Sequence, residues 1–174
     1  MSVIPPLHRV PPIVVMGVAG AGKTDIGTML ATRLDVDFMD GDDLHPQANI
    51  DKMASGHPLN DDDRRPWLAN IAAWLSEHTG EGAVVACSAL KRMYRDQLRQ
   101  ACPDVVFIHL AGDREVVTER VTARAGHFMP ASLVDSQYAT LEPLTPDEVG
   151  ITLNFDASRD ELTDEAATWV ASLE

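Results

Sequence analysis

The chain has 174 residues, of which 45% are hydrophobic and 24% charged, a composition typical of one globular domain with a buried core. Its 27 acidic and 14 basic residues give a formal net charge of −13, so nucleic acid and anionic membranes are unsuitable partners. The start of the chain lacks a signal peptide's apolar core, and no stretch approaches the ~20 apolar residues of a membrane span. We therefore expect a cytoplasmic protein.

Strands and helices alternate along the chain after a lead-in over residues 1–12, where four prolines predict an extended segment. The β-branched run IVVMG at 13–17 predicts a buried first strand, and the apolar spacing of 23–34 predicts a helix. The short run DFMD at 37–40 predicts a second strand. We expect this strand to lie beside the first.

The later elements complete a single domain over residues 13–174. Residues 46–56 predict a helix with Pro46 in its first turn. A longer, tryptophan-rich helix follows, and we expect Asp62 or Asp63 to cap it. The remaining expected elements are strands at 83–88, 105–110 and 150–157 and helices at 92–101, 114–125 and 160–173. This alternation predicts an α/β fold of three layers, with a five-stranded parallel sheet covered by helices on both faces.

A phosphate-binding loop follows the first predicted strand. Residues 17–24, GVAGAGKT, match G-x-x-x-x-G-K-[ST] in full between a strand and a helix. Glycines let backbone N–H groups turn toward phosphates, and the helix N-terminus adds positive potential. We expect ATP here, with Lys23 on its β- and γ-phosphates and Thr24 on Mg²⁺. The cofactor-binding residues expected in this loop are Gly17, Val18, Ala19, Gly20, Ala21, Gly22, Lys23 and Thr24.

Such a loop is common to kinases, GTPases, motors and ATPases. A GTPase would also carry an N-K-x-D or T-K-x-D guanine reader after a strand, and the sequence contains neither. The size of the chain, without visible insertions for partner binding, favours a small-molecule kinase. A non-catalytic nucleotide-binding regulator is the alternative from a different class.

Three carboxylates follow the second predicted strand in the segment FMDGDDLHP, 38–46. Residues two apart in an extended segment point the same way, so Asp40 and Asp42 can address one small volume. Asp40 would then lie near Mg²⁺, and Asp42 would accept the proton of an acceptor hydroxyl. Asp43 is better placed to cap the next helix. The alternative is that all three carboxylates only cap helices and face solvent.

Four segments together resemble bacterial gluconokinases, which are P-loop sugar-acid kinases. They are GVAGAGKT (17–24), DGDDLHPQANIDKMASGHPLNDDDRRPW (40–67), CSALKRMYRDQLR (87–99) and ARAGHFM (123–129). The resemblance implies ATP-dependent phosphorylation of D-gluconate at its 6-hydroxyl, which feeds sugar-acid catabolism and the pentose phosphate pathway. It also implies a homodimer and a fold similar to shikimate and nucleoside monophosphate kinases. Shikimate or a related sugar acid is the alternative acceptor.

The acceptor needs hydroxyl partners and cations together. Within an acceptor-binding segment over 44–80, His45 would bind hydroxyls and Arg64 would offer a fork donor to a carboxylate or phosphate. At least two of the three aspartates at 61–63 are expected to serve the helix dipole. In the resembling kinases, the segment after the third strand faces the γ-phosphate. The substrate-binding residues expected are Asp42, His45, Arg64, Ser88, Lys91, Arg124 and Gln137.

The resemblance also implies a mobile lid over residues 120–135. Arg120 and Arg124 lie four residues apart on one helical face, and such arginines swing onto ATP in the resembling families. The alternative is an ion pair with Glu115 or Glu119. Of the other candidates, Ala157 and Ser158 are placed near adenine by position, Arg92 and Arg95 near the site, and Arg99 on a solvated face. The expected catalytic residues are Lys23, Asp42 and Arg124, and the expected metal ligands are Thr24 and Asp40.

Overall fold

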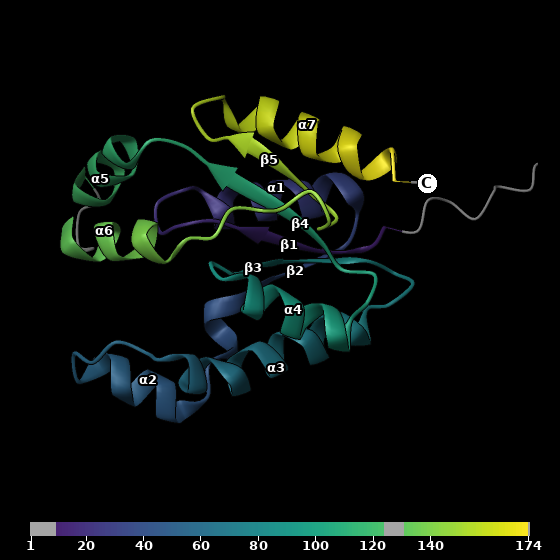
Figure 1. Ribbon diagram of the computed structural model, residues 1–174. Coiled ribbons are helices and arrows are strands. Elements are labelled where there is room, and N and C mark those ends of the chain that lie inside the picture. Colours follow the sequence, from purple (N-terminus) through teal and green to yellow (C-terminus); the bar gives the residue numbers. More distant parts are fainter. Residues whose placement is uncertain (1–9, 124–130, 174) are drawn as a thin grey trace, which may run out of the picture.

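A five-stranded parallel sheet forms the centre of the computed structural model, which describes residues 10–123 and 131–173 (Figure 1). The strand order is β2-β3-β1-β4-β5, and each neighbouring pair is parallel. The strands are β1 (Pro12–Met16), β2 (Asp37–Asp40), β3 (Ala83–Ala86), β4 (Val106–Ala111) and β5 (Gly150–Asn154). The predicted α/β class and parallel sheet are confirmed.

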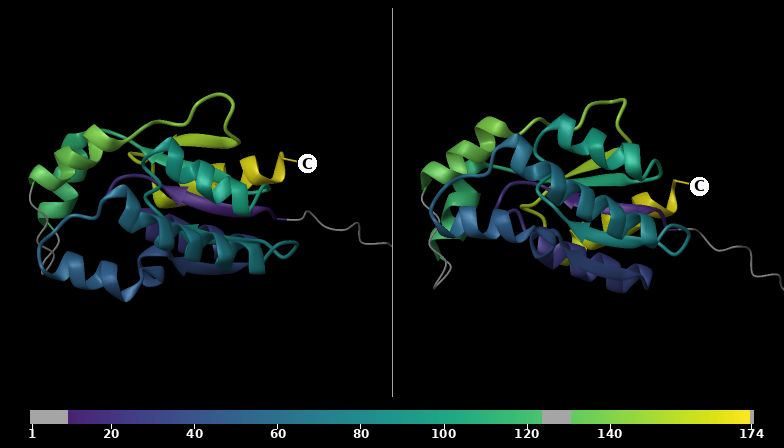
Figure 2. Two further views of the ribbon diagram at one scale, coloured as in Figure 1. Left: turned by 60° about the horizontal axis from the view of Figure 1, so that its bottom comes forward. Right: turned by 90° about the horizontal axis from the view of Figure 1, so that it is seen from below.

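Some helices cover the two faces of this sheet, and others lie near its carboxyl end. They are α1 (Lys23–Leu34), α2 (Gln47–Ala54), α3 (Asp61–Glu77), α4 (Arg92–Ala101), α5 (Arg114–Ala123), α6 (Ala131–Thr140) and α7 (Arg159–Ala171), with a 3₁₀ turn η1 (Gly41–Leu44). Helices α1 and α7 pack on one face, and α3 and α4 on the other (Figure 1). Figure 2 shows α2 on one side of the strand ends and α5 with α6 on the other. No described helix is long and apolar enough to cross a membrane.

The sequence of β1, the central strand, is apolar throughout because both of its faces are buried. Ile13 and Val15 pack toward α1 and α7, whereas Val14 and Met16 pack toward α3 and α4. All four side chains are fully buried. A parallel strand covered by helices on both faces needs such a continuous apolar run, because neither face is solvated.

The second strand does not lie beside the first, so that expectation was wrong. Strand β3 pairs with both β1 and β2 and separates them. Its four residues are all buried, whereas β2 starts at the exposed Asp37. The apolar β3 therefore fits an interior position, and the more polar β2 fits the edge of the sheet.

Two expected helix caps were also wrong. Asn60 caps α3: its side chain accepts from the Asp63 N–H at 2.7 Å, and the Asp63 carboxylate accepts from the Asn60 N–H at 2.9 Å. This is a reciprocal capping box, so Asp63 lies inside the first turn. Asp43 lies exposed in η1, and Pro46, which precedes α2, provides no side-chain cap. Asp40 caps η1 instead, accepting from the Asp42 N–H at 3.0 Å.

Helix α6 was not predicted from the sequence. It contributes the buried Val134 to the core and places the half-buried Tyr138 one turn later, where the phenol donates to the Gly112 carbonyl at 2.9 Å. Two apolar positions four residues apart give too short a pattern to distinguish a helix from a lid loop. The contact with Gly112 joins this helix to the end of β4.

A buried ion pair lies behind the loop that follows β3. Arg95 is fully buried, and its Nε donates to Glu148 at 2.7 Å while its Nη1 donates to the Ala89 carbonyl at 2.8 Å. Arg99 also donates to Glu148, at 3.3 Å, so the expectation that Arg99 lies on a solvated face was wrong. Burial alone would raise the pKa of Glu148, but the hydrogen bonds and charges of the two arginines outweigh it and lower that pKa. Arg95 therefore supports the loop from inside.

Acid should destabilise the unaltered protein more than a His109→Leu variant. His109 in β4 is 3% exposed, and neither ring nitrogen has a hydrogen-bond partner among the described residues. Burial, aided by the charge of Arg95, lowers its pKa from 6.5 to about 4. The unfolded chain therefore binds the proton first, so stability is lost as the pH falls from about 6.5 toward 4.

The loss attributable to His109 should be on the order of 3 kcal/mol. Urea denaturation at several pH values should show a shallower fall for the variant across this window. Parallel curves for the two proteins would contradict the burial of a neutral His109.

Candidate active site

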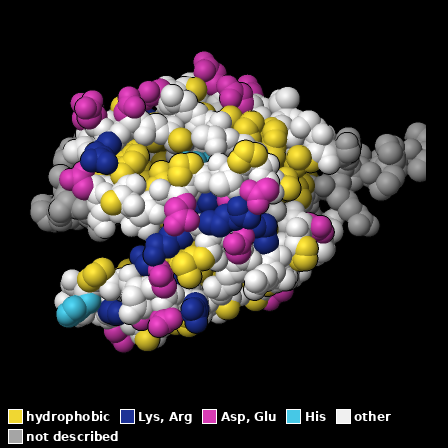
Figure 3. Space-filling view, in the orientation of Figure 1, with side chains coloured by type: hydrophobic (Ala, Val, Ile, Leu, Met, Phe, Trp, Pro, Cys, Tyr) yellow, Lys and Arg dark blue, Asp and Glu magenta, His cyan; other side chains and the backbone are white. Residues whose placement is uncertain are grey.

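The candidate site lies at the carboxyl ends of the strands. There β1 leads into the P-loop, β2 leads into η1, and β3 leads into the loop before α4. Figure 3 shows the molecule hollowed between the part that carries α5 and α6 and the part that carries α2. Parallel α/β sheets hold their ligands at this edge, because the loops that follow the strands converge there.

The P-loop, residues 17–24, is held in shape by its own lysine. Lys23 Nζ donates to the Gly17 carbonyl at 2.9 Å and to the Val18 carbonyl at 3.0 Å. Burial lowers the pKa of Lys23, and the charge of Asp42 opposes that shift. A side chain at position 17 would place its Cβ 2.8 Å from the Leu110 carbonyl oxygen, at a φ of 151°. Only glycine therefore allows the loop to start this close to β4.

One carboxylate at the end of β2, that of Asp40, reaches the P-loop helix α1. Thr24 Oγ1 donates to Asp40 Oδ2 at 3.4 Å, so the hydroxyl and carboxylate expected to hold Mg²⁺ lie together. Both are oxygen ligands, which Mg²⁺ prefers. No group of three or more His, Cys, Asp or Glu in the described part of the chain could hold a metal ion by itself. The pair therefore suits a cation that takes its remaining ligands from phosphates and water.

Asp42 lies in η1, two residues after Asp40. Its side chain is 85% exposed, yet partial desolvation raises its pKa, and the negative charge of Asp40 raises it further. Lys23 acts in the opposite direction on the same carboxylate. A raised pKa makes Asp42 a stronger base while it remains accessible, which is what proton acceptance from a bound hydroxyl requires.

The turn that carries Asp42 is held on α3. Trp67 Nε1 donates to the Gly41 carbonyl at 2.7 Å, and the His45 ring stacks on the Trp67 ring with centroids 4.4 Å apart. His45 Nε2 lies 4.0 Å from Asp42 Oδ1. Burial lowers the pKa of His45, which favours the neutral ring. His45 therefore lies near Asp42 and packs on α3 as well, and its binding of substrate hydroxyls stays a prediction.

A second group of charges lies at the start of α3 and α4. Lys91 Nζ donates to both carboxylate oxygens of Asp61, at 3.0 and 3.2 Å, and the Tyr94 hydroxyl donates to Asp61 Oδ1. Arg64 Nη1 donates to the Tyr94 oxygen at 3.2 Å and to the Leu59 carbonyl at 2.9 Å. We call Asp61, Arg64, Lys91 and Tyr94 the Tyr94 cluster. The structure thus joins the two predicted cations Arg64 and Lys91.

Sequence reasoning missed the roles of Asp61 and Tyr94. Asp61 was treated as one of three aspartates at a helix terminus, and Tyr94 as part of a helical pattern. The available signal was that Lys91 immediately precedes the predicted helix at 92–101 while Tyr94 lies in its first turn, which keeps the two residues close together. Ser88 lies near the start of the loop between β3 and α4, and Lys91 lies at its end. The Ser88 carbonyl accepts from the Gly17 N–H at 3.3 Å.

Arg120 contacts the P-loop from α5. It donates to the Gly20 carbonyl at 3.2 Å and to the Phe155 carbonyl at 3.1 Å, and its guanidinium lies 4.8 Å from the Phe155 ring centroid. A pocket of about 370 Å³ is lined by these residues and by Leu162. Ser158, predicted near adenine, caps α7 by accepting from the Glu161 N–H. Arg124 lies outside the described residues.

Gln137 approaches the P-loop from α6. Its Oε1 accepts from the Ala19 N–H at 2.6 Å. Since a backbone N–H can only donate, the amide oxygen must face the loop. The amide NH₂ group of Gln137 therefore remains available to donate to a ligand.

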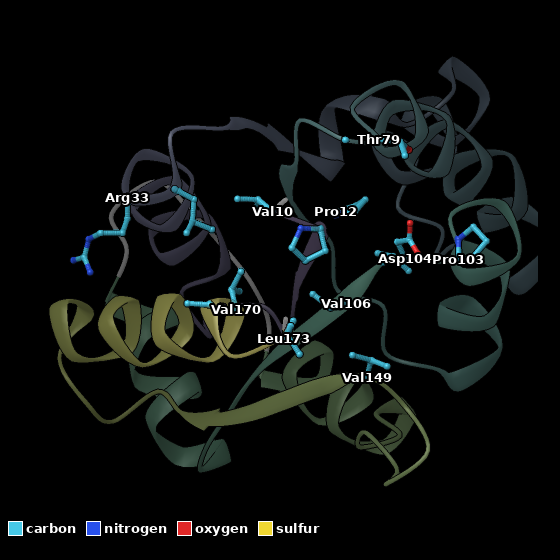
Figure 4. A pocket seen from close by; sticks show the side chains of 15 residues that line it. Val10, Pro12, Arg33, Thr79, Pro103, Asp104, Val106, Val149, Val170 and Leu173 are labelled. Carbon is cyan, nitrogen blue, oxygen red and sulfur yellow. The ribbon is translucent and has the colours of Figure 1, made fainter. Parts of the chain in front are cut away.

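Another pocket, of about 660 Å³, lies at the other end of the sheet (Figure 4). Its walls include Pro12 and Val106, where β1 and β4 begin, together with Leu173. The labelled side chains there are mostly apolar, with Arg33 and Asp104 as the charged ones (Figure 4). This pocket lacks the P-loop and the acidic cluster, so we do not assign the chemistry to it.

Comparison with known proteins agrees with this geometry. A family model described as shikimate kinase matches residues 19–148. A gluconokinase of Gluconobacter oxydans is 49% identical over 155 residues, which cover 88% of this chain and 87% of the relative. The thermoresistant gluconokinase of Escherichia coli is 46% identical over 140 residues, covering 79% and 80%.

Solved structures also resemble this chain. A gluconokinase from Sinorhizobium meliloti 1021 has a TM-score of 0.87 at 43% identity, over 95% of this chain and 94% of that one. A shikimate kinase from Acinetobacter baumannii in complex with shikimate has a TM-score of 0.58 at 15% identity, over 96% and 97%. The second likeness concerns the fold alone.

Replacing Lys23 with Ala should nearly abolish ATP turnover and leave the fold intact. The ammonium group is the cation expected on the β- and γ-phosphates, and removing one such electrostatic donor costs about 10²–10³ in rate. Product formation and circular dichroism of the purified variant would test this. Arg33→Ala, which removes an exposed cation paired with Asp164, is the control and should keep its rate. Normal turnover by the Lys23 variant would reject the P-loop assignment.

Proposed function

This chain belongs to the gluconokinase family, and from that premise we propose that it transfers the γ-phosphoryl group of ATP to the 6-hydroxyl of D-gluconate. The product is 6-phospho-D-gluconate. The observation that carries the proposal is the position of Asp42, an accessible carboxylate of raised pKa beside Lys23 and Asp40. A site that only bound nucleotide would not need a base at the acceptor position.

In the proposed reaction the chain positions both substrates and manages one proton. The P-loop amides and Lys23 bind the phosphates once Lys23 leaves the carbonyls of Gly17 and Val18. Asp42 orients the 6-hydroxyl toward the γ-phosphorus and accepts its proton, and His45 lies close enough to share in binding the sugar hydroxyls. Arg120 and Arg124 are proposed to neutralise charge on the transferred group.

Mg²⁺ is the proposed metal, with Thr24 and Asp40 as its protein ligands. When bound, it would neutralise charge on the phosphate oxygens. The two side chains are already 3.4 Å apart and share one hydrogen bond, so each already faces the other before a cation arrives. Asp40 also holds the Asp42 N–H, and in this way couples the metal site to the base.

The Tyr94 cluster is the proposed site for the carboxylate of gluconate. Arg64 and Lys91 supply positive charge, and an arginine fork matches the two oxygens of a carboxylate. Ser88 and the NH₂ group of Gln137 are proposed contacts nearer the transferred group, and Ala157 and Ser158 nearer adenine. In this proposal the Tyr94 cluster binds the carboxylate at one end of the linear acid, and Asp42 meets the reacting hydroxyl at the other end.

We also propose the wider organisation that the resemblance implied. Residues 13–174 would form one kinase domain, with an acceptor-binding segment over 44–80 and a lid over 120–135. The protein would be a cytoplasmic homodimer. Sedimentation equilibrium of the purified chain would test the dimer.

A coupled assay tests the proposed reaction directly. ATP and D-gluconate are supplied with Mg²⁺, and 6-phosphogluconate dehydrogenase reports the product. Shikimate, glycerate and nucleoside monophosphates are tested in parallel by ATP consumption, since the matching family model is that of shikimate kinase. Faster turnover of any of these than of gluconate would reject the proposed acceptor.

Asp42→Asn should cost about 10²–10⁴ in rate, because the amide keeps the shape of the side chain but cannot accept the proton. Asp43→Asn is the matched control, because it removes one negative charge from the neighbouring residue of η1, whose side chain is also exposed. It should change the rate little. Equal losses in the two variants would mean that Asp42 acts only through the net charge of the turn.

Arg64→Ala should raise the Michaelis constant for gluconate about tenfold or more while changing that for ATP little, because a fork donor to the carboxylate is lost. Lys91→Ala should act in the same direction. Initial rates with each substrate varied would separate the two constants. A larger effect on ATP than on gluconate would place these cations at the phosphates instead.

A further inference from the structure

The Tyr94 cluster contains two cations and one carboxylate. Asp61 is engaged by Lys91 through both of its oxygens and by Tyr94 through Oδ1. Arg64 forms no ion pair with any residue in 10–123 or 131–173, and its Nη1 is bonded instead to the Tyr94 oxygen and the Leu59 carbonyl. The cluster therefore keeps one positive charge in excess.

Asp61 also fixes the geometry of its partners. Its hydrogen bonds with Tyr94 and Lys91 lower the pKa of Asp61, and the bond with Asp61 raises the pKa of Lys91, so both stay ionised near neutral pH. The cations lie on the Tyr94 ring as well, since Arg64 Cζ and Lys91 Nζ are each 5.6 Å from its centroid. Side chains of Asp61 and Lys91 remain 39% and 29% exposed, so a ligand can reach them.

We propose that Asp61 determines acceptor specificity by reducing the charge of the Tyr94 cluster to a single excess positive charge. The cluster then matches one carboxylate and disfavours a phosphate dianion at the same end of the acceptor. The inference rests on the proposed function, because it concerns how that acceptor site selects its substrate. It gives Asp61 a positioning and selecting role in which it does not touch the reacting atoms.

The physical basis is that the cations of the site attract an anion while the Asp61 carboxylate repels it. A dianion that binds Arg64 and Lys91 brings its second charge close to the Asp61 carboxylate, which is tied to the same ammonium group. Like charges at such separations cost affinity, and specificity often depends on such a repulsive element. A cell holds many sugar phosphates that resemble a sugar acid in length and hydroxyl content, so a purely cationic site would bind them too.

The test compares D-gluconate with D-glucitol 1-phosphate. The second compound has the same number of carbons, the same hydroxyl configuration and a free 6-hydroxyl, but it carries a phosphate ester at C1 in place of the carboxylate. Its inhibition constant and the Michaelis constant for gluconate are measured for the unaltered protein, for Asp61→Asn and for Asp62→Asn. Asp62 is the matched control because it is the next residue of α3, is 82% exposed and pairs only loosely with Arg65, at 3.7 Å.

Asp61→Asn should shift the preference toward the dianion about tenfold or more, while Asp62→Asn leaves the preference unchanged. Equal shifts in both variants would mean that net charge alone acts at long range, and no shift in Asp61→Asn would mean that Asp61 does not select. Either result overturns the inference. If the unaltered protein does not phosphorylate gluconate, the proposed function is rejected, and the inference that rests on it is rejected as well.

Tyr94→Phe keeps the inference testable if Asp61→Asn does not fold. It removes the hydroxyl that joins Arg64 to Asp61 but leaves every charge in place. Both constants should therefore rise in the same proportion. A change in their ratio would show that hydrogen bonding, and not charge, sets the preference, and would overturn the inference.

Discussion

The arrangement of the site depends on how closely η1 approaches the end of β3. A Cβ at Gly41 would lie 2.5 Å from the Ala86 carbonyl oxygen, so glycine is the residue that lets the turn after β2 lie against β3. Because β3 separates β2 from the P-loop strand, Asp40 at the end of β2 contacts Thr24 across the end of β3. Trp67 then holds the turn through the carbonyl of the same glycine. One close backbone approach therefore holds the turn that carries Asp42, the proposed base, near the P-loop.

Much of the fold could be predicted because local patterns dominate it. The helix at 23–34 and the strand at 37–40 were predicted with the bounds that the structure has, since an apolar period and a P-loop mark them. Strand order could not be predicted locally, because it depends on which strand can be buried on both sides. The cap of α3 was missed because four consecutive residues, Asn60 and the aspartates of 61–63, can all serve as caps. Only the reciprocal pairing of Asn60 and Asp63 distinguishes them.

The site could be predicted where one motif contains all of its parts, as the P-loop does. It could not be predicted where the parts come from different elements. The Tyr94 cluster joins α3 to α4, and Asp61 and Lys91 are separated by a whole strand and helix in sequence. Likewise Gln137 reaches the P-loop across 118 residues. Such contacts follow from the packing of helices on the sheet, which no local pattern encodes.

The remaining question is how a chain of charge −13 holds two anionic substrates. Its structural cations are paired with carboxylates: Arg33 with Asp164, Arg92 with Asp147, Arg95 with Glu148 and Arg159 with Asp25. Three cations of the site behave differently, because Lys23, Arg64 and Arg120 each donate to backbone carbonyls. Lys91, the fourth, is paired with Asp61. A neutral carbonyl satisfies a cation without cancelling its charge, and an arriving phosphate or carboxylate makes the stronger, charge-assisted bond. The cations that donate to carbonyls are gathered at one edge of the sheet, where they can attract anionic substrates although the chain as a whole is acidic.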